Sequence, residues 1–139
     1  MILVDTNVVS EPLRRAPESR VVEWLDMQAL ETLYLSAITV AELRFGVHSL
    51  PAGRRRARLQ EDLERQVLPM FAGRVLAFDL AASQTYAELM AKARSDGRAI
   101  SLPDGYIAAT AAANAMMVAT RDTAPFEVAG LKTIDPWAE

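Results

Sequence analysis

Four acidic residues lie where predicted strands end or predicted helices begin. They are Asp5, Glu42, Asp104 and Asp122. Two carboxylates ~4 Å apart repel each other by roughly 4 kcal/mol at an effective dielectric constant of ~20, so four in one pocket require a cation. Carboxylate oxygens without histidine or cysteine favour Mg²⁺ or Mn²⁺ over zinc or copper. If the four acids converge, their site suits hydrolysis of phosphodiester bonds, in which bound metal activates water and stabilises the leaving oxygen.

Small polar residues accompany the two acids that follow strands. Thr6 and Asn7 come directly after Asp5, and Thr120 comes two positions before Asp122. Hydrogen bonds from such neighbours orient metal-binding carboxylates. We therefore expect Thr6, Asn7 and Thr120 to position the acids.

Each acid also has a purely structural interpretation. Thr39-x-x-Glu42 matches a capping box, in which the Glu42 side chain accepts a hydrogen bond from the backbone N–H of Thr39. Asp104 fits a turn, or the third residue of a helix capped by Ser101. Asp122 fits a turn before a proline. The sequence leaves these alternatives open.

Asp5 and a further aspartate, Asp79, differ in how well they fit a helix cap. Asp5 fits poorly, because Asn7 is the better cap for the helix that follows. Asp79 directly follows a predicted strand and precedes an apolar helical segment, so we predict that it is an N-cap and has no catalytic role.

The spacing of apolar side chains predicts the elements that carry these residues. Between predicted strands, apolar residues recur at helical spacing, as at Leu59, Leu63 and Val67. Alternating strands and helices imply a parallel sheet covered on both faces, and thus an α/β fold. The predicted strands are residues 2–4, 33–35, 75–78, 117–119 and 132–134.

Such a sheet would bring the four acids to one edge. Ligands of open parallel sheets bind beyond the carboxyl ends of the strands, where the strand order reverses. If the first and fourth strands are neighbours there, Asp5 and Asp122 face the same crevice. Helices that begin after the second strand and before the fourth would bring Glu42 and Asp104 to it.

Composition limits the class of protein. The chain has 139 residues, 51% hydrophobic and 24% charged, which predicts one globular domain over residues 1–139. It has no cysteine, which excludes disulfides, thiolate zinc sites and cysteine nucleophiles. Its apolar runs are interrupted too often for a signal peptide or a membrane span. We therefore expect a cytoplasmic protein that does not interact with membranes.

Arginine is unevenly distributed in this mildly acidic chain. The net charge is −3, which argues against nucleic-acid binding through the overall field. Arginines nevertheless cluster at positions 14, 15 and 20 and at positions 54–56 and 58. They could contact phosphates, since the guanidinium group binds them bidentately. They could equally form a solvated helix face, paired with Glu61, Asp62 and Glu64.

Taken together, several segments resemble the PIN-domain ribonucleases of the VapC toxin family, especially the FitB-like branch. The resemblance covers nearly the whole chain, and the ordered set of motifs is far more specific than DTN alone. The segments are MILVDTNVVSEP (1–12), SAITVAELRFG (36–46), DGYIAA (104–109), ATRDTAPF (119–126) and IDPW (134–137).

The resemblance implies a PIN-like fold with a five-stranded parallel sheet in the order 3-2-1-4-5. It further implies that Asp5, Glu42, Asp104 and Asp122 are the family's acidic quartet, which binds divalent metal and supports attack on RNA, either transfer or ribosomal RNA. It allows a larger residue than Gly105 after the third acid.

The resemblance also implies partners. Members typically form homodimers and pair with a small DNA-binding antitoxin, which alone contacts the operator DNA and whose tail fills a groove near the acids. Such a groove could be lined by Val22, Leu25, Leu43 and Phe45.

Two alternatives to an Mg²⁺-dependent endoribonuclease toxin are weighed. The first is a regulatory subunit that dimerises an operator-binding partner and retains only vestigial nuclease activity, which a damaged quartet would favour. The second is a phosphatase with Asp5 as nucleophile, which would require a second acid at Asn7. The intact quartet and the asparagine favour the nuclease.

Overall fold

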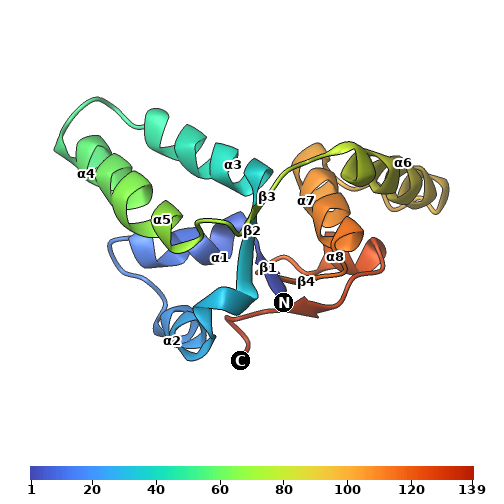
Figure 1. Ribbon diagram of the computed structural model, residues 1–139, viewed down its shortest axis with the longest axis horizontal. Coiled ribbons are helices and arrows are strands. Elements are labelled where there is room, and N and C mark those ends of the chain that lie inside the picture. The colour runs from blue at the N-terminus through green and yellow to red at the C-terminus, as the bar shows by residue number, and fades with distance from the viewer.

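Five short parallel strands form the centre of the computed structural model, which describes residues 1–139 (Figure 1). The strands are β1 (Ile2–Val4), β2 (Leu33–Ser36), β3 (Val75–Leu76), β4 (Met117–Ala119) and β5 (Thr133–Ile134). Their order across the sheet is β3-β2-β1-β4-β5, and every neighbouring pair is parallel. The predicted α/β class and the strand order 3-2-1-4-5 are confirmed.

The third strand is shorter than predicted. Pairing with β2 ends at Leu76, two residues before the predicted limit. Phe78 instead packs edge-on against Tyr86 and Tyr106, at ring-centroid distances of 5.9 and 5.2 Å. Aromatic packing therefore replaces strand pairing in this segment.

The helices lie on both faces of the sheet. In Figure 1, α1 to α5 lie on one side of the sheet, and α6, α7 and α8 lie on the other. In chain order, with short 3-10 segments η1 and η2 and the π-helical segment η3, they are α1 (Thr6–Ser10), η1 (Glu11–Leu13), α2 (Ser19–Met27), η2 (Leu30–Thr32), α3 (Ala37–His48), α4 (Arg54–Asp62), η3 (Leu63–Val67), α5 (Leu68–Met70), α6 (Leu80–Ser95), α7 (Leu102–Ala113) and α8 (Ala124–Val128).

Side chains of β1 alternate between two hydrophobic clusters. Ile2 and Val4 belong to the cluster formed with α1, α2 and α3, whereas Leu3 belongs to the cluster formed with α7 and α8. This alternation follows from the two-residue period of a strand. Ala108 and Ala111 of α7 are fully buried in the second cluster, because small side chains let the helix lie close to the sheet.

The strand order reverses between β1 and β4. The chain runs outward from β1 through β2 to β3, and then returns to place β4 on the other side of β1. Val4 pairs with Ala119 in register. The residues that follow these two, Asp5 and Thr120, therefore leave the sheet side by side at the predicted binding edge.

Local signals at helix ends agree in part with prediction. Asp79 caps α6, as predicted, and accepts a hydrogen bond from the backbone N–H of Ala82 at 2.9 Å.

None of the helices combines the length and the apolar character that crossing a bilayer would require.

Candidate active site

Asp5 lies at the carboxyl end of β1, beside the end of β4. Its backbone N–H donates to the carbonyl oxygen of Ala119 at 2.9 Å. The residue is only 6% exposed, and both carboxylate oxygens accept hydrogen bonds. Oδ1 accepts from the backbone N–H of Thr6 and Oδ2 from the hydroxyl of Thr120, each at 2.8 Å. The carboxylate is therefore fixed at the edge of the sheet.

Asp5, and not Asn7, is the N-cap of α1. The prediction that Asn7 caps this helix was wrong, because α1 begins at Thr6, directly after the strand. Asn7 lies within the first turn, and its Oδ1 accepts a hydrogen bond of 3.4 Å from the backbone N–H of Arg121. The side chain of Asn7 thus forms no hydrogen bond to an acid, and instead connects α1 to the loop after β4.

Burial and neighbouring charge raise the pKa of Asp5. The largest cause is desolvation of the carboxylate, and the negative charges of Asp104 and Glu42 add to it. Hydrogen bonds from Thr120 and Thr6 act in the opposite direction because they stabilise the ionised form. Asp104 and Glu42 are thus close enough to Asp5 to influence its charge.

Glu42 lies in the second turn of α3 and does not form the alternative capping box. The N-cap of α3 is Ser36, whose hydroxyl accepts a hydrogen bond from the backbone N–H of Thr39 at 3.0 Å. The capping-box interpretation was wrong because the helix begins three residues earlier than it required. Glu42 instead accepts a hydrogen bond of 2.7 Å from the hydroxyl of Thr6.

A pair of threonines links Glu42 to the first helix. The hydroxyl oxygens of Thr6 and Thr39 lie 3.2 Å apart, and Thr39 is fully buried. Thr6 therefore contacts Asp5 through its backbone and Glu42 through its side chain. Two of the predicted acids are connected through this one residue.

Asp104 is the third residue of α7, whose N-cap is Ser101, as one alternative predicted. The hydroxyl of Ser101 lies 3.4 Å from the backbone nitrogen of Asp104, which donates to it. An acid in the first turn interacts favourably with the helix dipole. Asp104 thus has a structural role as a first-turn acid, and it also acts electrostatically on Asp5.

Gly105 is constrained by the packing of α7 against α6. A Cβ atom at this position would lie 2.7 Å from Sδ of Met90 and 3.2 Å from a ring carbon of Tyr86. A larger residue at this position would therefore require the flexible end of Met90 to move. Glycine allows the helix that carries Asp104 to approach its neighbour closely.

Asp122 lies in the exposed loop between β4 and α8. Its backbone carbonyl oxygen lies 3.4 Å from the hydroxyl of Thr120. Its carboxylate is not among the groups that shift the pKa of Asp5. The structure thus brings the backbone of Asp122 to the site, whereas its side chain forms no hydrogen bond.

None of the four acids has a basic partner. The ion pairs of the chain, which are Arg14–Glu11, Arg44–Glu64, Arg58–Asp62 and Lys92–Asp96, include none of the four. No three acidic or histidine side chains are gathered tightly enough to enclose one metal ion. The four unpaired carboxylates fit a hard divalent cation in charge and chemistry. Their side chains would have to move closer together to bind the same cation.

Comparison with known proteins identifies the family. Residues 2–131 match the PIN domain family. The chain belongs to this family. The PIN-domain relatives include VapC ribonuclease Y4jK of Sinorhizobium fredii, which is 61% identical over 99% of this chain and 98% of its own length. Plasmid stability protein StbB of Pseudomonas syringae pv. tomato is 59% identical over 99% of both chains, and toxin FitB of Neisseria gonorrhoeae is 53% identical over 99% of both.

Solved structures of PIN-domain relatives have the same fold. The crystal structure of FitAcB from Neisseria gonorrhoeae matches with a TM-score of 0.97 and 52% identity over the full length of both chains. A structure of FitAB bound to an IR36 DNA fragment matches with a TM-score of 0.95 and 52% identity, over 99% of this chain and 96% of the other. The predicted PIN-like fold is thereby confirmed.

Sequence reasoning missed two residues of the PIN-domain site. Ser36 fixes the start of α3, and Thr39 packs its hydroxyl against Thr6. A signal for Ser36 was present, since it directly follows a predicted strand and N-caps often lie there. No local signal distinguishes Thr39, because its contact joins residues 33 positions apart.

Proposed function

We propose that residues 1–139 act as one PIN domain with metal-dependent endoribonuclease activity, serving as the toxin of a type II toxin–antitoxin pair in the cytoplasm. One observation carries this proposal. In a chain 61% identical to a VapC ribonuclease, a buried Asp5 lies within the electrostatic reach of Glu42 and Asp104. None of these carboxylates has a basic partner.

Asp5, Glu42, Asp104 and Asp122 would hold Mg²⁺ or Mn²⁺. The chemistry that such a cation would supply is activation of water and stabilisation of the leaving oxygen of the RNA phosphodiester. Asp5 is the most firmly held of the four, because two hydrogen bonds of 2.8 Å fix its carboxylate. The absence of a competing ammonium or guanidinium group leaves the carboxylates free to bind a cation.

Threonines and an asparagine position these acids. Thr120 holds Asp5, and Thr6 holds Glu42 at 2.7 Å. Asn7 accepts from the backbone of Arg121, so it fixes the loop that carries Asp122. These contacts support the roles predicted for Thr6, Asn7 and Thr120, with Asn7 acting through the loop backbone.

The partners follow from the relatives. Toxin FitB is 53% identical to this chain, and a structure of FitAB bound to DNA matches it at a TM-score of 0.95. We infer that this chain forms a homodimer and pairs with a small DNA-binding antitoxin, which contributes the contacts to operator DNA and inhibits the nuclease.

One groove of the structure contains a residue that was predicted to contact the antitoxin. A groove of about 290 Å³ between α1, α3 and α4 is lined by Leu43 and by Glu42. Val22, Leu25 and Phe45 do not line this groove, and Phe45 is 73% exposed. All four residues therefore stay predictions, because Leu43 lies in this groove and the exposed Phe45 is available to a partner outside it.

The decisive experiment maps RNA cleavage. Purified protein without antitoxin is incubated with total cellular RNA in Mg²⁺, in Mn²⁺ and in chelator, and new RNA ends are sequenced. Asp5→Asn should abolish discrete metal-dependent cuts, whereas Asp26→Asn, an exposed aspartate on α2, should retain them. A thermal melt supplies a second readout, because Mn²⁺ should stabilise the wild type and stabilise Asp5→Asn much less.

The regulatory-subunit alternative is favoured by one observation, the DNA-bound FitAB complex. If folded, metal-loaded protein produces no cuts while its complex with the antitoxin binds operator DNA more tightly than the antitoxin alone, that alternative replaces the nuclease.

A further inference from the structure

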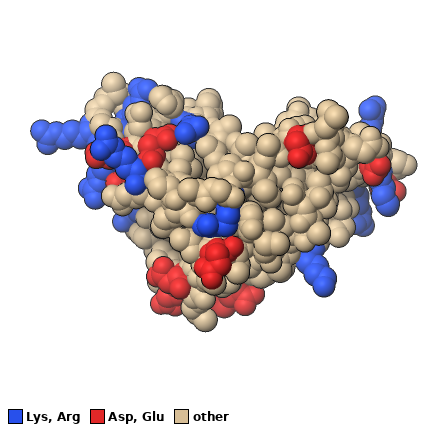
Figure 2. Space-filling view, viewed as in Figure 1, with Lys and Arg blue, Asp and Glu red and all other residues tan.

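A pocket of about 520 Å³ lies between α4 and the segment that follows η1. Its charged lining consists of five arginines and one aspartate, which are Arg14, Arg15, Arg54, Arg55, Arg58 and Asp62. Figure 2 shows basic side chains gathered around the corner of the molecule that carries α4. The pocket is thus strongly positive in a protein whose net charge is −3.

Most of this positive charge is not neutralised within the chain. Arg15, Arg54 and Arg55 form no ion pair, and Arg58 approaches Asp62 only to 4.0 Å. The alternative of a solvated helix face is confirmed in part, because Arg54, Arg55 and Arg58 are exposed and Arg58 pairs with Asp62, whereas Arg54 and Arg55 form no ion pair. Glu64, one of those acids, pairs instead with Arg44 on α3 at 2.7 Å.

One arginine of the pocket is held in place by a buried acid. Arg14 pairs with Glu11 at 3.1 Å, and Glu11 is only 2% exposed. The second oxygen of Glu11 accepts from the backbone N–H of Glu18 at 3.2 Å. The segment that forms one wall of the pocket is therefore tied down, which lowers the entropic cost of binding an anion.

The arginine pocket continues into the groove that contains Glu42. The groove and the pocket share four lining residues, which are Leu13, Arg14, Arg55 and Leu59. Thr6 and Glu42 line the groove, and both contact or influence the Asp5 site. A chain molecule bound at the acids can therefore extend along the groove to the arginines.

We propose that the arginine pocket binds the backbone phosphates of RNA that flank the cleaved bond, an inference that rests on the proposed nuclease function. In metal-free protein the acids repel a polyanion, and the net charge of the chain gives it no general attraction, so a local positive site supplies the affinity for RNA away from the metal. Guanidinium groups favour phosphate because they donate bidentately. Arg15, Arg54 and Arg55 are accordingly binding residues for substrate, set apart from the groups that cleave it.

The first test measures binding in the absence of cleavage. A fluorescent single-stranded oligoribonucleotide is titrated with Asp5→Asn protein in chelator at several salt concentrations. Adding Arg15→Gln, Arg54→Gln and Arg55→Gln should weaken binding roughly ten-fold or more and reduce the slope of log Kd against log salt by about 2, since each lost phosphate contact to a single strand removes ~0.7.

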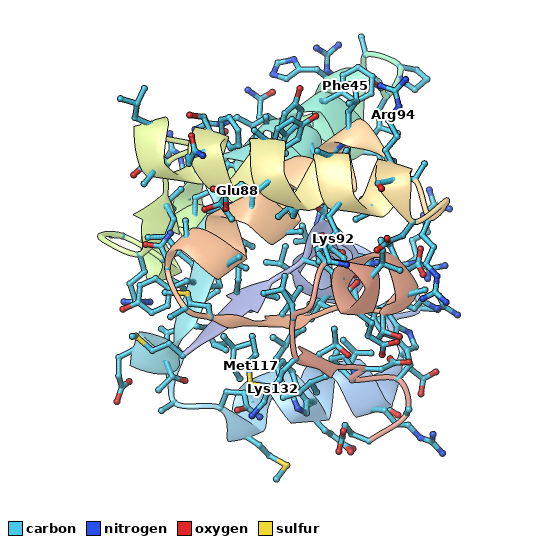
Figure 3. The ribbon with its side chains drawn as sticks, turned by 90° about the vertical axis from the view of Figure 1, so that its right-hand side faces the viewer. Phe45, Glu88, Lys92, Arg94, Met117 and Lys132 are labelled. Carbon is cyan, nitrogen blue, oxygen red and sulfur yellow. The ribbon has the colours of Figure 1, made fainter.

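A matched control removes the same charge elsewhere. Arg94, Arg98 and Lys132 are exposed and form no ion pair. Figure 3 shows Arg94 on α6 and Lys132 at the opposite, lower end of the view, and neither lines the arginine pocket. Replacing these three by glutamine should leave the salt slope nearly unchanged. An equal decrease in the salt slope of both triple variants would contradict phosphate binding by the pocket and would indicate an effect of net charge alone.

The second test separates this proposal from the nuclease itself. In the otherwise wild-type chain, the pocket variant should raise KM for RNA and leave kcat unchanged. If the pocket variant cleaves RNA with an unaltered KM and an unaltered salt slope, the proposed phosphate-binding role of the pocket is wrong and the proposed nuclease activity is retained. If the wild-type protein does not cleave RNA but its RNA binding still depends on the arginines, the proposed nuclease activity is wrong and the proposed role of the pocket is retained. A pocket variant that keeps RNA affinity but loses affinity for a glutamate-rich peptide would show a protein-binding site and overturn the RNA proposal.

Discussion

The hydroxyl of Thr120 lies 2.8 Å from Oδ2 of Asp5, although 115 positions separate the two residues in the chain. Each residue directly follows its strand, and the two strands pair with Val4 opposite Ala119. The hydrogen bond is buried. The parallel register therefore places a hydroxyl donor beside Asp5, where burial disfavours the ionised carboxylate.

Thr120→Val should destabilise the protein at neutral pH without removing an acid. Valine has nearly the shape of threonine but leaves Asp5 without one of its two donors, at a cost of about 1–3 kcal/mol in the free energy of unfolding. Urea unfolding measures this change. Thr120→Ser keeps the hydroxyl and should lose less stability. Equal stability of the valine variant and the wild type would contradict a role for this hydrogen bond.

The stability of metal-free protein should depend on pH through Asp5. Because burial raises the folded-state pKa of Asp5 above the ordinary 3.8, the folded state retains a proton that the unfolded state has lost. This carboxyl therefore lowers the free energy of unfolding as pH rises above about 3.8 through the folded pKa. Asp5→Asn should remove this loss and raise Tm at pH 7.

The control for this pH dependence is Asp26→Asn on the exposed surface. Melts are recorded in chelator between pH 4 and 8, and the difference between Asp5→Asn and the wild type should grow with pH. A constant difference would mean that Asp5 titrates normally in the folded protein. Asparagine is compatible with the site, because its Oδ1 can still accept from Thr6 while Thr120 turns to the backbone carbonyl of Asp122.

Ser36→Ala should lower the free energy of unfolding by about 1 kcal/mol, since the first turn of α3 loses the hydroxyl that accepts from Thr39. Denaturant unfolding tests this expectation, with Ser83→Ala on the exposed part of α6 as the control. Because α3 carries Glu42, Mn²⁺ should also stabilise the Ser36→Ala variant less. An unchanged free energy of unfolding in the Ser36→Ala variant would argue that another residue caps α3.

Gly105→Ala should destabilise the packing of α6 on α7. The added Cβ would lie 2.7 Å from Sδ of Met90, and overpacking of this kind costs about 1–3 kcal/mol. Met90→Ala should relieve the clash, so the double variant should lose less stability than the two single variants together. A double-mutant cycle measures that coupling. Additive losses would show that Met90 moves aside at no cost.

The sequence alone determined the fold class and most strand positions, and it supplied the four candidate acids. A strand that is buried on both faces of a parallel sheet is a short, continuous aliphatic run. The strands at residues 2–4, 33–35 and 117–119 were therefore predicted with little error. Local chemistry likewise predicted Asp79 as a cap and offered Ser101 as one of two alternatives, because a cap depends on neighbours within three residues.

Only the tertiary structure decided how the acids are held and where the arginines face. The contacts Asp5–Thr120 and Thr6–Glu42 join residues 115 and 36 positions apart, and they depend on strand register and helix orientation. The constraint at Gly105 exists only because α6 packs against α7. Local propensity carries no information about such long-range contacts, because they form only after the sheet and its helices have assembled.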